Sequence, residues 1–194
     1  MYQLEGGNTM AKVYIFLANG FEEIEALTVV DLLRRASIDI SMVSITGSLE
    51  VKGSHDIIVK ADQLFEETDF NEADLLVLPG GMPGTAHLME HQGLDKLLRE
   101  FHSKNKNMAA ICAAPSVLGT KGFLAGKRAT CYPGFESKLT DSIIENQAVV
   151  EDGNVITSRG LGTAIDFSLS LINKLMDKET AKRIADGIIY KHYL

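Results

Sequence analysis

A single cysteine stands in the apolar segment MAAICAAPSVLG at residues 108–119, where a buried strand is expected to end and a helix to begin. Pro115, three residues after Cys112, suits the first turn of a helix, where its missing N–H costs little. Ala110 and Ala114 flank the cysteine as small residues do in nucleophile elbows, whose tight turn excludes larger side chains. Free N–H groups and the helix dipole at such a turn favour a thiolate and lower the thiol pKa. The alternative is a buried cysteine that only packs in a core.

Two glycines follow another predicted strand in the segment LPGG at residues 78–81. Gly80 and Gly81 can adopt backbone conformations closed to other residues, so their N–H groups can point into a crevice. Together with the N–H of Ala113 they would form an oxyanion hole with donors from two neighbouring loops. A flexible turn between a strand and a helix is the alternative.

Three glutamates open a predicted helix in the segment NGFEEIEA. Acidic residues in a first helical turn usually stabilise the helix dipole and stay solvated, which accounts for Glu22 and Glu23. Glu25 differs, because the residues four positions before and after it, Phe21 and Val29, are apolar. A carboxyl group in apolar surroundings has a raised pKa, and beside a thiolate it would donate a hydrogen bond or act as general acid and base. The alternative is an amphipathic helix with an imperfect apolar face.

The five histidines do not complete a Cys–His–Asp triad, because none of them is a sequence neighbour of Cys112. His87 and His91 are four residues apart, a spacing that places two metal ligands on one helix face. No glutamate-bearing zinc motif and no cysteine pair accompanies them. We therefore expect a solvated helix face and no metal site.

Composition limits the class of protein. The 194 residues suffice for one well-buried domain, and 45% hydrophobic with 23% charged residues is a globular balance. A net charge of −7 with scattered Lys and Arg argues against broad nucleic-acid binding, which needs clustered basic residues. No apolar run reaches the ~20 residues that span a bilayer, and the first residues lack a signal-peptide pattern. With only two cysteines, we expect a cytoplasmic protein without disulfides.

Strand and helix patterns alternate along the chain and predict a mostly parallel sheet with helices on both faces. Apolar runs typical of buried strands occupy residues 12–18, 39–45, 73–81 and 108–112. Strands around a turn are expected at 50–62 and a hairpin at 148–158. Helices are expected at 22–36, 85–104, 114–126, 136–145, 162–176 and 178–194.

This alternation predicts one α/β domain over residues 12–194, preceded at 1–11 by a flexible extension or a cloning remnant. Sites in such sheets gather at the carboxyl ends of the strands. We therefore expect the segments 18–25, 79–84 and 112–115 to meet at one crevice.

Taken together, these motifs resemble those of the ThiJ/PfpI superfamily, and within it the branch of the parkinsonism-associated deglycase and YajL. The resemblance covers residues 12–194 and rests on GFEEIEA (20–26), LPGG (78–81), AAICAAPSVL (109–118), TSRGLGTAIDF (157–167) and IIYKHYL (188–194), in this order. It implies a flavodoxin-like three-layer α/β/α sandwich with a cysteine nucleophile elbow, and a homodimer.

The resemblance also assigns residues and activities. It implies that Cys112 is the reactive cysteine of the elbow and that Glu25 is its protonated hydrogen-bond partner. Gly80, Gly81 and Ala113 would line the oxyanion pocket. The cysteine of this family oxidises readily to a sulfinic acid, which the neighbouring glutamate stabilises. Family activities include cofactor-independent conversion of methylglyoxal to lactate and removal of early glyoxal adducts from proteins and nucleotides, with chaperone and oxidative-stress roles also attributed to it.

Two positions depart from the family patterns. Protease-like relatives carry a histidine directly after the nucleophile, where this chain has Ala113, which argues against peptidase activity. The deglycase has a histidine near the pocket in the segment that matches TCYPGFESK, where this chain has Tyr132. Tyr132 can donate a hydrogen bond to a substrate oxygen but is a poor base near neutral pH. Cys131 beside it is a second thiol, interpreted as structural.

We therefore expect an enzyme that acts on 2-oxoaldehydes through Cys112 and Glu25, without cofactor or metal, and that protects against oxidative stress. The alternative is a non-enzymatic redox-sensing chaperone in which Cys112 oxidises to a sulfinic acid. A scaffold with an ordinary buried cysteine is the third interpretation. The expected partners are a small aldehyde, glycated proteins or nucleotides and a second copy of the chain, with no membrane and no stable nucleic-acid complex.

Overall fold

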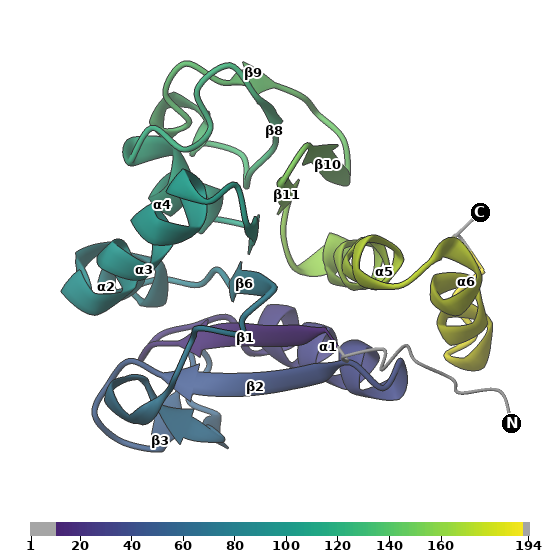
Figure 1. Ribbon diagram of the computed structural model, residues 1–194, viewed down its shortest axis with the longest axis horizontal. Coiled ribbons are helices and arrows are strands. Elements are labelled where there is room, and N and C mark those ends of the chain that lie inside the picture. The colour runs from purple at the N-terminus through teal and green to yellow at the C-terminus, as the bar shows by residue number, and fades with distance from the viewer. Residues whose placement is uncertain (1–10, 192–194) are drawn as a thin grey trace, which may run out of the picture.

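The computed structural model describes residues 11–191, and within them seven strands form one sheet in the order β10-β11-β7-β6-β1-β2-β5 (Figure 1). The strands are β1 (Lys12–Leu17), β2 (Asp39–Ser44), β5 (Gln63–Leu64), β6 (Leu75–Leu78), β7 (Asn107–Ile111), β10 (Val149–Asp152) and β11 (Val155–Ser158). Neighbours in this sheet run parallel, except that β10 pairs antiparallel with β11. The extension expected at residues 1–11 lies outside the described residues except for Ala11.

Two small two-stranded sheets accompany the main one. The strands β3 (Glu50–Lys52) and β4 (Ile58–Lys60) pair antiparallel across the turn predicted at Gly53 and Ser54. The strands β8 (Arg128–Ala129) and β9 (Ile143–Ile144) pair parallel.

Helices cover both faces of the main sheet, which gives three layers (Figure 1). One layer contains α1 (Glu23–Arg35), α5 (Ala164–Leu175) and α6 (Lys178–Gly187). The other contains α2 (Gly84–Glu90), α3 (Gln92–Ser103) and α4 (Pro115–Thr120). Short 3₁₀ turns are η1 (Phe65–Glu67), η2 (Glu136–Lys138) and η3 (Leu161–Thr163).

Alternate side chains of β1 enter two separate cores, because successive residues of a strand point to opposite faces. Val13, Ile15 and Leu17 pack in the core under α1 and α5. Tyr14 and Phe16 pack in the core with residues of α3 and α4. Burial on both faces explains why the sequence of β1 is almost continuously apolar.

Two expected helices differ in extent from the sequence pattern. The helix expected at 85–104 is divided into α2 and α3 at His91, whose Nδ1 accepts a hydrogen bond from the Leu94 N–H and so caps α3. At 178–194 the helix α6 ends at Gly187.

Of the two helices expected between 114 and 145, one is shorter than predicted and the other is absent. The helix expected at 114–126 ends at Thr120, and Gly122 then adopts a left-handed φ of 79°. The helix expected at 136–145 is wrong, since this segment contains only the single turn η2 and the strand β9. Its residues offer no broad apolar face that a helix could bury.

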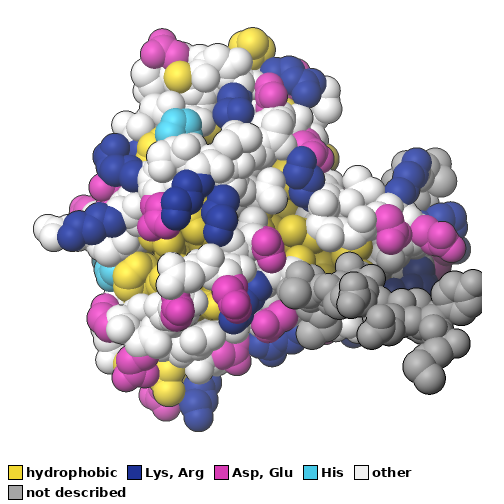
Figure 2. Space-filling view, in the orientation of Figure 1, with side chains coloured by type: hydrophobic (Ala, Val, Ile, Leu, Met, Phe, Trp, Pro, Cys, Tyr) yellow, Lys and Arg dark blue, Asp and Glu magenta, His cyan; other side chains and the backbone are white. Residues whose placement is uncertain are grey.

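The surface gives two further observations. Within residues 11–191 there is no helix with both the length and the apolar character to cross a membrane. Figure 2 shows Lys and Arg side chains interspersed with Asp and Glu over one face of the molecule, as the scattered basic residues of the sequence predict.

The order of the strands fixes where a crevice forms. The chain passes from β1 to β2 on one side and later enters β6 on the other side of β1. The strands β1 and β6 therefore flank a switch point, beyond whose carboxyl ends ligands bind in open α/β sheets. The residues that follow β1, β6, β7 and β11 all emerge at this edge.

Candidate active site

Cys112 follows β7 directly and forms the sharp turn predicted from the sequence. Its φ of 66° lies in the left-handed region, which is uncommon for residues other than glycine. Two backbone hydrogen bonds hold this conformation: the Cys112 N–H donates to the Ser158 carbonyl at 2.9 Å, and its carbonyl accepts from the Tyr132 N–H at 2.8 Å. The backbone therefore fixes the partly exposed thiol at the carboxyl edge of the sheet.

Glu25 reaches the same point from the first turn of α1 and is only 1% exposed. The Gly80 N–H donates to Glu25 Oε2 at 2.9 Å, and Glu25 also forms a hydrogen bond with Cys112. A Cβ atom at Gly80 would lie 2.6 Å from both Cys112 Cβ and Glu25 Oε2, so only glycine fits between them. The Gly80 N–H, predicted to serve in an oxyanion hole, thus binds Glu25 here, and its action on a substrate stays a prediction.

The N–H groups of Gly81 and Ala113 both point at the Cys112 sulfur. Gly81 has a left-handed φ of 90°, and a Cβ atom there would collide with the backbone at Glu22. Two backbone donors from two loops therefore converge on the thiol, as the sequence predicts. Their action on a substrate oxyanion remains a prediction.

Burial raises the pKa of Glu25 to about 7, and the nearby Glu22 carboxylate acts in the same direction. Hydrogen bonds from Cys112, Gly80 and the Leu161 N–H favour the carboxylate and partly oppose this rise. Glu25 therefore exchanges its proton close to neutral pH, where a general acid and base is most effective.

Burial and the charge of the Glu25 carboxylate raise the pKa of Cys112 to about 12, against the lowering effect of the Ala113 and Gly81 N–H groups. The predicted lowering of the thiol pKa is therefore wrong, because burial outweighs the two N–H groups. Because the two side chains share a hydrogen bond, they titrate as a pair. When their proton lies on Glu25, the repulsion ends and the carboxyl group donates to the thiolate.

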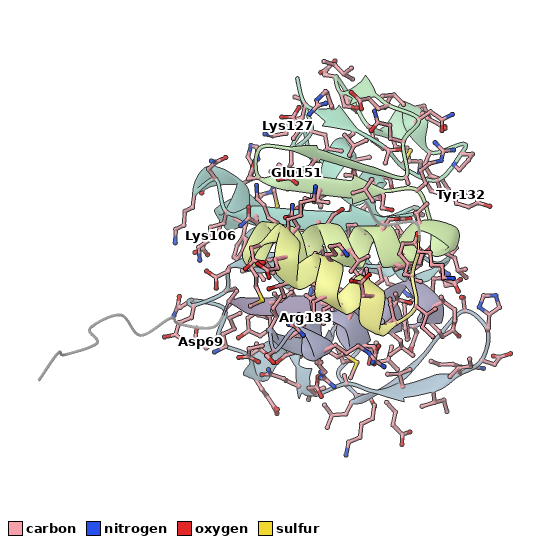
Figure 3. All side chains as sticks on the ribbon, turned by 90° about the vertical axis from the view of Figure 1, so that its right-hand side faces the viewer. Asp69, Lys106, Lys127, Tyr132, Glu151 and Arg183 are labelled. Carbon is pink, nitrogen blue, oxygen red and sulfur yellow. The ribbon has the colours of Figure 1, made fainter. Side chains whose placement is uncertain are left out.

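Tyr132 and Gly160 border the thiol on the solvent side. The Tyr132 side chain is half exposed, and Figure 3 places it at the end of the sheet opposite to Lys106, which precedes β7. Gly160 follows β11, and a Cβ atom there would lie 3.8 Å from Cys112 Sγ. The sequence motif TSRGLG includes this loop, but none of its residue types predicted that the loop lies beside the thiol.

A comparison with protein-family models matches residues 11–174 to the DJ-1/PfpI family. The chain belongs to the DJ-1/PfpI family. This result confirms the superfamily and the α/β fold predicted from the sequence motifs.

Individual relatives support the same conclusion. The chain is 37% identical over 182 residues to "Protein DJ-1 homolog B" of Arabidopsis thaliana, covering 93% of this chain but only 42% of that protein. It is 32% identical over 180 residues to the "Glutathione-independent glyoxalase DJ-1" of Schizosaccharomyces pombe, covering 88% and 94% of the two chains. The solved structure "Toxoplasma gondii DJ-1, oxidized" superposes with a TM-score of 0.90 at 36% identity, covering 94% of this chain and all of the other.

The second thiol of this DJ-1/PfpI protein has a different environment. Cys131 is 2% exposed. Burial and the Glu136 carboxylate raise its pKa to about 11, partly opposed by Arg159. The structural role predicted for Cys131 agrees with this burial and stays a prediction.

Glu23 is the site residue that the sequence interpretation missed, since it was expected to be solvated. It is 2% exposed and lies under the turn between β3 and β4. The His55 N–H donates to Glu23 Oε1 at 2.8 Å, His55 Nδ1 lies 3.0 Å from Oε2, and the Ser54 hydroxyl donates to Oε2 at 3.2 Å. Burial acts to raise the pKa of Glu23, but these hydrogen bonds lower it to about 2.

The same turn brings together potential metal ligands. Glu22, Glu23 and His55 offer ligand atoms within 4.8 Å of one another. Their side chains already bond to one another or to Ser54, and the hydrogen bond to Glu23 raises the pKa of His55, with the Glu22 charge adding to it. A raised pKa disfavours the neutral imidazole that a metal requires.

His87 and His91 do not share a helix face as their spacing suggests. His87 Nδ1 donates to the Asn19 carbonyl at 2.9 Å, whereas His91 stands between α2 and α3 and uses Nδ1 to cap the second helix. These bonds occupy one nitrogen of each ring.

Proposed function

We propose that the protein is a cofactor-independent enzyme that converts small 2-oxoaldehydes such as methylglyoxal into 2-hydroxy acids such as lactate. The observation that supports this most is the contact between Cys112, held in a left-handed turn, and Glu25, whose pKa lies at about 7. A nucleophile and a proton carrier with the pKa of a general acid and base thus share one hydrogen bond. The name of the Schizosaccharomyces pombe relative, a glutathione-independent glyoxalase, supports the same reaction class.

In the proposed reaction, the Cys112 thiol passes its proton to Glu25 and its sulfur attacks the aldehyde carbon, C1. The resulting hemithioacetal oxygen accepts hydrogen bonds from the N–H groups of Gly81 and Ala113 and takes the proton from Glu25, which becomes a carboxylate again. The Glu25 carboxylate then removes the proton from C1 and returns it to C2 through an enediol, while the hydroxyl proton moves from the C1 oxygen to the C2 oxygen. This gives a thioester of the 2-hydroxy acid, and water hydrolyses it to release the acid and the free thiol.

Methylglyoxal consumption without glutathione, with lactate measured enzymatically, tests this proposal. We expect the wild-type protein to form one lactate for each methylglyoxal consumed. The Cys112→Ser variant should lose at least about 100-fold in kcat/KM, because a hydroxyl is a much weaker nucleophile at this site. The matched control is Cys131→Ser, which keeps the reactive pair intact and should retain the activity. Wild-type protein that consumes no methylglyoxal, or a fully active Cys112→Ser variant, would contradict the proposal.

A second candidate function is redox sensing through Cys112. It is favoured by the partial exposure of this thiol and by its N–H donors, since a sulfinate carries its charge on oxygens that such donors stabilise. The similar Toxoplasma gondii structure is described as oxidised, which supports this role. Under mild hydrogen peroxide, we expect mass spectrometry to find two added oxygen atoms on Cys112 and none on the buried Cys131. Equal oxidation of the two thiols would exclude this role.

A further inference from the structure

Gly160 lies where three groups of the site converge. A Cβ atom at Gly160 would stand 3.8 Å from Cys112 Sγ, 3.8 Å from Glu25 Oε1 and 3.3 Å from the Tyr132 ring carbon Cδ2. A side chain at this position would therefore contact the thiol sulfur, the carboxyl oxygen not bound by Gly80, and the Tyr132 ring. The Gly160 Cα forms the wall of the site at this point.

Hydrogen bonds hold this wall in place. The Gly160 N–H donates to the Thr163 hydroxyl at 3.1 Å, and the Gly160 carbonyl accepts from the Thr163 N–H at 2.8 Å. The Thr163 hydroxyl also lies 2.7 Å from the hydroxyl of Ser158, the last residue of β11. The wall is thus tied to the sheet and does not retreat freely from a larger ligand.

The two glycines on either side of the thiol restrict the site in different ways. At Gly80 a Cβ atom would overlap Cys112 and Glu25 at 2.6 Å, so a side chain there would displace the reactive groups themselves. At Gly160 the contacts of 3.8 Å with Cys112 and Glu25 are ordinary van der Waals distances, so a methyl group would leave these two groups where they are, although the Tyr132 ring at 3.3 Å would have to shift slightly and the φ of 159° would be strained. The methyl group would instead occupy the space between Cys112, Glu25 and the Tyr132 ring.

Any compound that reacts with both the Cys112 thiol and the Glu25 carboxyl group needs this space. A carbon bonded to Cys112 Sγ exchanges a proton with Glu25 only if it comes within hydrogen-bond reach of the carboxyl oxygen. Its substituents then lie against Gly160, because Gly160 borders both the sulfur and Oε1. The Tyr132 ring limits the same space from the rim.

We propose that Gly160 is the specificity-determining residue of the site: its missing side chain admits carbonyl compounds with a substituent no larger than a methyl group, and the Tyr132 ring excludes bulkier ones. The substrate class is therefore short, unbranched 2-oxoaldehydes. The naming of this class rests on the proposed function, whereas the size limit on reagents that reach Cys112 does not.

The test compares Gly160→Ala with the matched control Gly162→Ala, which changes the same loop at a position with open space around it. The substrates compared are glyoxal and methylglyoxal, which differ by one carbon. We expect Gly160→Ala to lower kcat/KM for methylglyoxal at least about tenfold more than kcat/KM for glyoxal, which is the discrimination that one carbon gives in a tight pocket. Gly162→Ala should keep the wild-type ratio. An unchanged ratio in Gly160→Ala would overturn the proposal.

A second measurement needs no enzymatic activity. We expect Gly160→Ala to slow alkylation of Cys112 by iodoacetamide at least about tenfold, while oxidation by the smaller hydrogen peroxide changes by less than about twofold. Equal effects on both reagents would contradict the size limit. If wild-type protein consumes no aldehyde, the proposed function fails, and the alkylation result still decides the role of Gly160.

A third variant covers the case in which Gly160→Ala does not fold, as judged by its thermal unfolding curve. Tyr132→Ala opens the rim and leaves Gly160 unchanged. We expect it to raise the reactivity of Cys112 toward a bulky maleimide relative to iodoacetamide, compared with wild-type protein. An unchanged ratio of the two rates would contradict the exclusion of bulky compounds by the Tyr132 ring.

Discussion

Glu23 and Glu25 stand two residues apart in the first turn of one helix, and both are almost completely buried, yet their surroundings shift their pKa values in opposite directions. Glu23 meets the backbone N–H and ring of His55 and the hydroxyl of Ser54, and its pKa falls to about 2. Burial dominates at Glu25, and its pKa rises to about 7. The balance between the cost of burial and the strength of the hydrogen bonds to the carboxylate decides the sign of the shift.

Within one turn of helix, the two glutamates are therefore suited to different roles, Glu23 to holding the structure and Glu25 to proton transfer. An ionised Glu23 anchors the turn between β3 and β4 to the start of α1. Glu25 exchanges its proton near neutral pH beside a thiol, which suits it to catalysis. Substitutions at the two positions should therefore have opposite consequences for activity and for stability.

The largest expected effect is on activity. Glu25→Gln keeps the size of the side chain but removes the proton carrier, and we expect kcat/KM for methylglyoxal to fall by about 10²–10⁴-fold. Glu23→Gln should remain within about threefold of wild type at pH 7, since Glu23 does not contact the thiol. Steady-state kinetics of the two variants measures the contrast. Equal losses at both positions would show that the two glutamates do not differ in role.

The pH dependence of the Cys112 alkylation rate should show the second-largest difference between the two glutamates. In wild-type protein, we expect the iodoacetamide rate of Cys112 to rise through a step near pH 7, where the pair with Glu25 loses its first proton. In Glu25→Gln this step should disappear, whereas Glu23→Gln should retain it. Labelling followed by mass spectrometry measures the alkylation rates of Cys112 and Cys131 in the same sample. A step for Cys131 at the same pH would contradict the assignment, because Cys131 has a pKa raised to about 11.

Stability should respond to Glu23. We expect Glu23→Gln to lower the free energy of unfolding at pH 7 by about 1–3 kcal/mol, the cost of leaving buried donors without their charged acceptor. The folded-state pKa of about 2 lies below the ordinary value of 4.5, so this stabilisation is present above pH 4.5 and is lost as the pH falls toward 2. Urea unfolding at pH 7, 4 and 2.5 checks this. A difference that grows on acidification would contradict the assignment.

The smallest effect is expected from Glu25 on stability. Its folded-state pKa of about 7 exceeds the ordinary 4.5, so its stabilisation is full below pH 4.5 and is lost as the pH rises through 7. Gln does not titrate, and the stability of Glu25→Gln relative to wild type should increase by about 1–2 kcal/mol between pH 5 and pH 8. Urea unfolding at these two pH values measures the change, and a relative loss of stability over this range would refute it.

Much of the fold follows from local patterns of the sequence. The buried strands β1, β6 and β7 are short apolar runs that end at glycine, proline or Cys112, and the structure has them within a few residues of the predicted limits. The helix predicted at 136–145 is wrong, because this segment has no broad apolar face that would select a helix, and its contacts with neighbouring segments decide its conformation. The two-residue pairing of β8 with β9 is a tertiary effect that no local pattern specifies.

The meeting of Cys112 and Glu25 at one edge of the sheet was predictable from the sequence, but the electrostatics of the site were not. Cys112 and Glu25 could be brought together because parallel strands end at one edge of the sheet. The burial of Glu23 depends on a turn about 30 residues away that folds over α1, as its hydrogen bonds with Ser54 and His55 show. The use of the Gly80 N–H by Glu25 is likewise a contact between distant segments.

The dependence of the Cys112 turn on the Ser158 carbonyl has a consequence for protein synthesis. Glu25, Gly80 and Cys112 leave the ribosome well before β11, which carries that carbonyl and ends at the wall formed by Gly160. A nascent chain that stops short of β11 therefore holds a thiol without its enforced backbone turn and with one side of its pocket missing. We expect such a thiol to behave like any exposed cysteine. The enforced backbone turn of Cys112 thus forms only after β11 has joined β7, late in translation.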